Sequence, residues 1–299
     1  MRRNRIIGTA LALSAAVWLA GWIGTLAGLA GAVHVENVGW AAVAAVAAAC
    51  AFSAALQPSE HRARTSFAFF GAGLLAWALG QAAWTVYGFE GVTVPYPSLS
   101  DVGYLGAMPF FAAGVLTWPR RRRVWTSGAL IDGALAAGAV AVVSYTFSFE
   151  PIFENGVTGA QAWLGILYPA SELALVAIIG GGLLFDVWTD RGRVALVGLG
   201  LLSLAAADTF FAVDALDGSL SPLVDGGWTL ALAAMGAASL LPNGWPARVT
   251  RRVPEFLPAV AVTGLLGVAA ASFAIRELGQ HGWQAADAVA VGFLLVLVA

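Results

Sequence analysis

The chain has 299 residues, of which 60% are hydrophobic and 11% are charged. Soluble domains carry about 25% charged residues, so this composition excludes a water-soluble globular protein and indicates helices that face lipid or one another. All 15 basic residues are arginines, the formal net charge is −2, and the lone Cys50 excludes an intrachain disulfide and a cysteine-based metal site.

The chain begins with a basic segment, followed by an apolar run over residues 6–31. This run is about twice as long as the apolar core of a signal peptide, roughly 7–15 residues, so we expect a retained first helix. A membrane helix needs about 20 mainly apolar residues, and ten segments reach or approach that length. They are residues 6–31, 38–57, 66–88, 101–118, 124–148, 160–185, 194–214, 222–241, 256–277 and 282–299. The sequence therefore predicts an all-α, polytopic membrane bundle of about ten transmembrane helices, forming a single domain over residues 1–299.

Arginine is distributed unevenly among the predicted loops. Fourteen of the fifteen arginines lie in the N-terminal segment and in every second loop, whereas the opposite loops contain only Arg276. The opposite loops carry acidic residues instead, among them Glu36, Glu90 and Glu150. Because cytoplasmic loops are enriched in basic residues, we expect the N-terminus in the cytoplasm and the Pro95–Asp101 loop outside. Ten helices then return the C-terminus to the cytoplasm.

The Pro95–Asp101 loop is the most distinctive polar stretch of the chain, and it leads directly into an apolar helix. The spacing Ser98-x-x-Asp101 is typical of a capping box at a helix start. We expect Tyr96, Ser98, Asp101 and Tyr104 to border a cavity on the outer side. The alternative for Asp101 is a structural one, since a carboxylate in the first turn stabilises the N-terminus of its helix.

A weaker copy of this pattern lies over residues 217–240, where Asp225 follows another loop with Gly, Ser and Pro. Asp101 and Asp225 are 124 positions apart, and Gln81 and Asp208 are 127 positions apart. An even number of predicted helices separates the matching points, so the two copies would run parallel rather than inverted. The expected repeats cover about 38–148 and 160–277.

Four acidic residues fall within predicted spans, namely Asp132, Glu172, Asp208 and Asp287. An ionisable group at membrane depth costs at least ~2.5–3.5 kcal/mol, so it normally faces the bundle interior. Glu172 and Asp208 are the deepest, and either a functional polar cavity or simple hydrogen bonds between helices would explain them. A structural role remains open for Asp132, which lies near the arginine-rich end, and for Asp287, which lies near an interface.

Several kinds of site are disfavoured. His34, His61 and His281 all fall in predicted loops, which excludes haem held by two intramembrane histidines. His34 and His281 share the outer side, so a shared metal is a minor alternative. The sequence has no glycine-rich phosphate loop, HExxH or GxSxG motif. We therefore expect no cofactor, no metal and no catalytic residue, and no nucleic-acid partner for the short arginine-rich loop at 120–123.

The string PYPSLSDVGYLGAMPFFAAGVL, preceded by WTVYGFEG, resembles the membrane-embedded N-terminal region of bacterial, chiefly actinobacterial, signalling proteins with GGDEF and EAL domains. The strings LIDGALAAGAV, LYPASELALVA and AAADTFFA extend the resemblance over roughly residues 70–240. It implies a location in the inner (plasma) membrane and a sensing or anchoring role in cyclic-di-GMP synthesis or breakdown. The GGDEF and EAL motifs are absent from these 299 residues, so no enzymatic activity is expected of this chain itself; a diguanylate cyclase or phosphodiesterase activity would belong to the full-length protein.

The last predicted span reaches Ala299 without an interfacial residue, so we expect a cytoplasmic output domain to follow, through which the protein would form a homodimer. The leading hypothesis is a sensory and anchoring module in the lipid bilayer that responds to a small molecule or to the membrane. The candidate ligand-binding residues are Tyr96, Ser98, Asp101, Tyr104, Asp132, Tyr168, Glu172 and Asp208. The alternative is a small-solute or proton-coupled transporter that uses Glu172, Asp208 and Asp132. An intramembrane enzyme is a third hypothesis, but the sequence shows no pairing of a nucleophile with a base.

Overall fold

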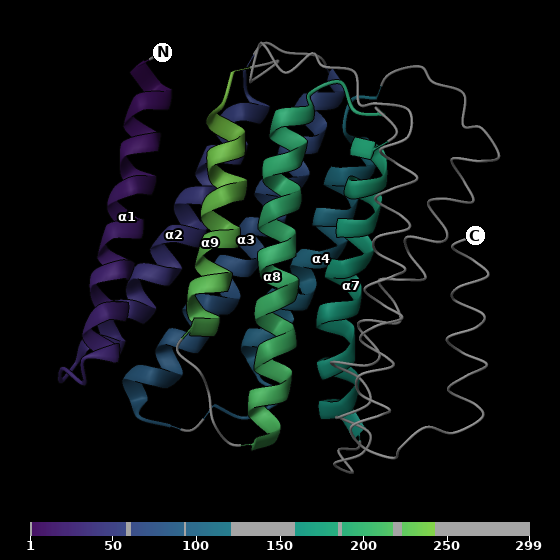
Figure 1. Ribbon diagram of the computed structural model, residues 1–299. Coiled ribbons are helices and arrows are strands. Elements are labelled where there is room, and N and C mark those ends of the chain that lie inside the picture. The colour runs from purple at the N-terminus through teal and green to yellow at the C-terminus, as the bar shows by residue number, and fades with distance from the viewer. Residues whose placement is uncertain are drawn as a thin grey trace, which may run out of the picture.

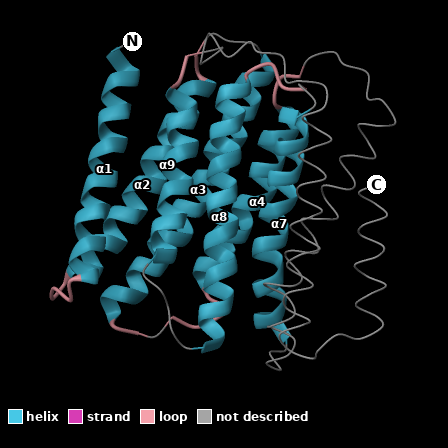
Figure 2. Ribbon diagram, in the orientation of Figure 1, coloured by secondary structure: helices cyan, strands magenta, loops and turns pink. Residues whose placement is uncertain are grey.

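The computed structural model describes residues 2–57, 61–92, 94–120, 159–184, 187–217 and 223–242. The elements in these ranges are helices, apart from an isolated bridge between Arg120 and Trp188 (Figures 1 and 2). Their bounds are α1 (Arg2–Leu26), α2 (Ala32–Ala55), α3 (His61–Glu90), α4 (Leu99–Thr117), α7 (Gly159–Leu184), α8 (Arg191–Asp217) and α9 (Leu223–Leu240).

The helices match seven of the predicted spans, and this part of the chain is all-helical as expected. Five of them, α1, α2, α3, α4 and α7, are long and apolar enough to cross a membrane. The predicted spans at 124–148, 256–277 and 282–299 lie outside the described residues, and so do Asp132, Asp287 and His281.

Six helices form a closed ring. Along the ring α2 packs on α3, α3 on α4, α4 on α7, α7 on α8, α8 on α9, and α9 on α2. Helix α1 lies outside the ring, against α2 and α9 (Figure 1). The helices run side by side, so the ring has two ends, and each end gathers residues of one kind.

One end is rich in arginine, and we call it the arginine end. Here arginine side chains donate hydrogen bonds to carbonyl oxygens at or near helix C-termini, where such groups lack a partner within the helix. The pairs are Arg3 with Ser53, Arg64 with Ala55, Arg120 with Leu116, Arg191 with Leu183, and Arg193 with Leu241. The described arginines expected on one side of the membrane therefore do share one end of the bundle.

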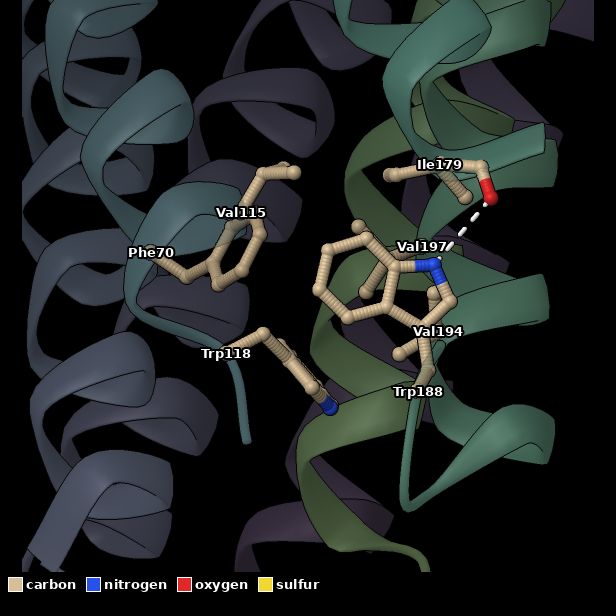
Figure 3. Close-up of a pocket in the computed structure, with 7 residues that line it drawn as sticks. All are labelled: Phe70, Val115, Trp118, Ile179, Trp188, Val194 and Val197. Atoms are coloured by element: carbon tan, nitrogen blue, oxygen red, sulfur yellow. Dashed lines mark hydrogen bonds between the residues drawn. The ribbon is translucent and has the colours of Figure 1, made fainter. Parts of the chain in front are cut away.

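A small apolar cavity of about 10 Å³ lies near the arginine end, between the α3–α4 and α7–α8 pairs (Figure 3). It is lined by Phe70, Val115, Trp118, Ile179, Trp188, Val194 and Val197. The indole N–H of Trp188 donates to the backbone oxygen of Ile179 at 3.2 Å, whereas the buried indole N–H of Trp118 has no hydrogen-bond partner among the described residues. The space is at the lower limit for one water molecule, about 10–15 Å³, and is a packing gap rather than a binding site.

The prediction was wrong for the connection between the first two helices. Helix α1 ends at Leu26, and Gly31, with a φ of 76°, precedes α2 at Ala32. His34 and Glu36, predicted in a loop, therefore lie in the first turns of α2, and Glu36 is 3% exposed. His61, also predicted in a loop, is the first residue of α3. The error arose because a charged residue such as Glu36 near a helix end is also typical of a loop. In the structure Glu36 is buried and lies beside Asp225 of α9.

Candidate functional site

At the end opposite the arginines, the loop before α4 is fixed by the expected capping box. The backbone N–H of Ser98 donates to Asp101 Oδ2 at 2.6 Å, and Ser98 Oγ accepts from the N–H of Ser100 at 3.2 Å. The loop is also tied to α7, since Gln161 Nε2 donates to the backbone oxygen of Tyr96 at 3.0 Å. The capping box predicted from Ser98 and Asp101 is therefore confirmed.

Asp101 has a second role that its sequence position did not reveal. Its other oxygen, Oδ1, accepts a hydrogen bond from the Tyr168 hydroxyl at 2.7 Å, which joins α4 to α7. Both residues are 9% exposed. Because both carboxylate oxygens already have partners, Asp101 is a structural link between two helices as well as a helix cap.

Tyr104 lies one turn further along α4 and faces α3. Its hydroxyl donates to Gln81 Oε1 at 2.6 Å, and its ring packs on Trp77 with centroids 4.8 Å apart. The hydroxyl interacts electrostatically with Asp101, Asp208 and Asp225. The side chains of α4, α8 and α9 thus converge on one region inside the ring.

Asp208 forms the corresponding link between α8 and α9. Its Oδ1 accepts a hydrogen bond from the indole N–H of Trp228. The Trp228 ring stacks on Trp40 of α2 at 5.1 Å and contacts Phe211 at 5.4 Å. Phe211 in turn contacts Tyr96 at 6.5 Å, so the loop before α4 covers this region. Burial, reinforced by the negative charges of Asp101 and Asp208, raises the pKa of the Tyr96 hydroxyl above its usual value.

Two pairs of carboxyl groups complete the region. Glu172 of α7 and Asp208 of α8 lie beside each other and interact electrostatically, and the two residues are 0% and 7% exposed. Glu36 of α2 and Asp225 of α9 form a second such pair. Both oxygens of Glu172 and one oxygen each of Glu36 and Asp208 are buried without a hydrogen-bond partner among the described residues.

We call this region the polar cluster. It consists of Glu36, Gln81, Tyr96, Asp101, Tyr104, Tyr168, Glu172, Asp208, Asp225 and Trp228. Seven of the eight candidate site residues lie in it or, like Ser98, directly against it, and Asp132 is outside the described residues. Sequence analysis missed Glu36, which it placed in a loop, and did not include Trp228 among the candidate site residues. The only available signal for Trp228 was its position 124 residues after Tyr104, the separation that also relates Asp101 to Asp225.

The two halves of the ring repeat the same local geometry. In the α3–α4 pair, a Cβ added to Gly103 would lie 2.5 Å from the Cα of Gly80, next to the Gln81–Tyr104 hydrogen bond. In the α8–α9 pair, a Cβ added to Gly227 would lie 2.8 Å from the Cβ of Ala207, next to the Asp208–Trp228 hydrogen bond. The positions differ by 124 on α4 and α9 and by 127 on α3 and α8, the separations seen in the sequence.

The cluster has the chemistry of a proton-carrying or polar-ligand site rather than of a metal centre. Among the described residues, no group of three or more His, Cys, Asp or Glu side chains is arranged to hold a metal ion. The described part of the chain is all-helical, contains five helices long and apolar enough to cross a membrane, and has a buried acidic cluster at one end. No protein-family model, no curated protein and no solved structure matches the chain.

Proposed function

We propose that this chain is a membrane-embedded sensory and anchoring module, and that the polar cluster is where it receives its signal. The observation that carries the proposal is the convergence of five carboxyl groups from five helices, away from the arginine end. Such a cluster is expensive to bury in a bilayer and is therefore expected to serve a function. A ligand or ion that prefers one arrangement of these helices would shift the bundle towards it.

The proposal includes the complete topology. The bundle would have about ten spans in a bacterial plasma membrane, with the arginine end in the cytoplasm and the polar cluster near the outer surface. The gathering of Arg3, Arg64, Arg120, Arg191 and Arg193 at one end supports this orientation through the positive-inside rule. The matching contacts at Gly103 and Gly227 support two parallel repeats.

The output would be a cytoplasmic GGDEF or EAL domain that makes or degrades cyclic-di-GMP, as the sequence resemblance implies. The test is the cyclic-di-GMP content of cells that express the full-length protein, compared with an asparagine substitution at Asp208 and with Tyr87→Phe. Tyr87 is a suitable control because it is half-buried on α3 and its hydroxyl has no hydrogen-bond partner among the described residues. We expect the Asp208 variant to change the cyclic-di-GMP level at unchanged expression and the control to leave it unchanged. Equal levels in all three proteins would contradict the sensory role.

A transporter is the second candidate, and the buried pair of acids Glu172 and Asp208 is the observation that favours it. A buried acid pair that gains and loses a proton is a common element of proton-coupled carriers. Reconstitution in liposomes with a pH gradient and an internal pH dye tests this directly. A carrier would dissipate the gradient faster than empty liposomes do, and neutralising Glu172 would abolish the difference. Proton flux no faster than in empty liposomes would leave the sensory module as the better explanation.

A further inference from the structure

The contact between Glu172 and Asp208 joins neighbouring helices of the ring deep in the bundle. Glu172 is completely buried, and neither of its oxygens has a hydrogen-bond partner among the described residues. Among the described residues no arginine contacts the pair, since the arginines with assigned contacts lie at the opposite end. Two carboxylates in contact without a cation would repel each other strongly in a medium of low dielectric constant.

The available hydrogen-bond donors distinguish the two members of the pair. Asp208 accepts from the indole N–H of Trp228, an N–H donor that suits an ionised acceptor. Glu172 has no such donor among the described residues, and burial without a donor favours its neutral, protonated form. In this arrangement the proton would lie on Glu172 and the negative charge on Asp208.

Among the described elements around the pair, none supplies a positive charge. From α4, Asp101 acts electrostatically on Asp208. From α7, Tyr168 lies one turn before Glu172 and is hydrogen-bonded to Asp101. The loop before α4 contributes Tyr96, and α9 contributes Trp228 and, nearer the end of the bundle, Asp225. These groups favour retention of the proton, and Asp101 with Tyr168 connects the buried pair to the loop before α4.

The other half of the ring is an internal comparison. There Gln81 occupies the position equivalent to Asp208 and accepts from Tyr104 in the way that Asp208 accepts from Trp228. An amide needs no proton to be neutral. The same helix–helix geometry is therefore built once with a neutral amide and once with a carboxyl pair, so packing alone does not require the acids.

We propose that Glu172 and Asp208 form a buried proton-binding site, and that the proton is the signal to which the bundle responds. This inference rests on the proposed sensory function for its biological meaning, but the site itself is defined by chemistry. Loss of the proton would leave two negative charges in contact and push α7 and α8 apart at this end. Near the arginine end the two helices stay close, because a Cβ added to Gly198 would lie 2.8 Å from Ile179 Cγ2, so the movement would be a splaying about that contact.

The test is infrared spectroscopy of the purified protein in lipid nanodiscs, which detects the C=O stretch of protonated carboxyl groups. We expect Glu172→Gln to lose one carboxylic-acid component at neutral pH. Asp208→Asn is expected to shift that component, because the acidic group beside the Glu172 carboxyl is replaced by a neutral amide. Glu36→Gln is the matched control, since it removes an acid of the other carboxyl pair and is expected to leave the Glu172 component in place.

A carboxylic-acid band that is identical in the wild type and in Glu172→Gln would overturn the site. If Glu172→Gln does not fold, an unshifted band in Asp208→Asn would overturn it equally. Cyclic-di-GMP output measured at different external pH values then tests the biological role separately. Output indifferent to pH, combined with the expected infrared changes, would refute the proton as the signal and leave the proton-binding site intact.

Discussion

Tyr168 is a single residue on which the closure of the ring depends. Its hydroxyl bridges α7 to Asp101 of α4, and few other polar contacts join these two helices along their length. The remaining described polar links between the halves on this side lie at the helix ends, where Gln161 meets Tyr96, Thr189 meets Pro119 and Arg120 meets Trp188. Loss of the hydrogen bond between Tyr168 and Asp101 is therefore expected to lower the free energy of unfolding of the whole bundle by a measurable amount.

We predict that Tyr168→Phe lowers the free energy of unfolding by about 1–3 kcal/mol, because it leaves a buried carboxylate oxygen of Asp101 without its donor. Thermal unfolding of the purified protein in detergent would measure the change. Tyr87→Phe is the control and is expected to have little effect. Equal unfolding midpoints for the two variants would show that the hydrogen bond contributes nothing net.

The start of α4 gives a second prediction at the residue scale. Ser98→Ala removes the oxygen that accepts from the N–H of Ser100 and should cost about 0.5–2 kcal/mol. Ser98→Thr keeps the hydroxyl, which also donates to Asp101 Oδ2 at 3.1 Å, and is expected to recover most of this loss. If Ser98→Ala and Ser98→Thr unfold at the same denaturant concentration, the side-chain cap does not contribute to stability.

At the scale of helices, α3 and α4 approach each other closely at Gly80 and Gly103. A methyl group at position 103 would lie 2.5 Å from the backbone of Gly80 and 2.6 Å from the backbone oxygen of Ala76, so neither neighbour is a flexible side chain that could move aside. This contact sets the distance at which Tyr104 reaches Gln81.

We therefore predict that Gly103→Ala destabilises the protein by about 1–3 kcal/mol through overpacking. Gly106→Ala lies on the same helix, and a Cβ there meets no atom within 4 Å. It should be neutral or stabilising by up to about 1 kcal/mol, because alanine favours a helix over glycine. Chemical denaturation of both variants would measure the difference, and the reverse order of stabilities would refute the close contact.

The positions of the helices could be predicted because apolar length and arginine placement are local properties of the sequence. The partners of polar residues could not be predicted in the same way. Asp101 was recognised from its spacing to Ser98, whereas its hydrogen bond to Tyr168 joins residues 67 positions apart and leaves no local pattern. Glu36 is predicted in a loop because nothing in the neighbouring sequence indicates that it is buried. The residue that lies beside it, Asp225, is on a helix far along the chain.

At the scale of the whole molecule, the two ends of the bundle differ in charge, and the orientation in the membrane follows from that difference. Leu56, beside the arginine end, is 70% exposed, and Val92, at the opposite end, is 52% exposed. Cys50 is 0% exposed, so its thiol is expected to react slowly with a labelling reagent. It can also be replaced by alanine, so that an introduced cysteine is the only one labelled.

We predict that a cysteine at position 92 is labelled by a membrane-impermeant maleimide in intact cells, whereas a cysteine at position 56 is labelled only after the membrane is opened. This outcome follows from the cytoplasmic preference of arginine-rich loops. Labelling of both positions in intact cells, or of position 56 alone, would refute the proposed orientation and place the polar cluster on the cytoplasmic side.

The location of α1 outside the ring has a practical consequence for anyone who shortens this protein. Gly21 of α1 packs directly against the backbone of Glu36, so the first helix shields one acid of the polar cluster from the hydrocarbon. Removing residues 1–31 would turn that shielded carboxyl towards lipid tails, at a cost of at least ~2.5–3.5 kcal/mol for a charged group. The first helix therefore keeps the hydrocarbon away from the acidic residues of the ring, and trimming it would disturb the end of the bundle that holds the polar cluster.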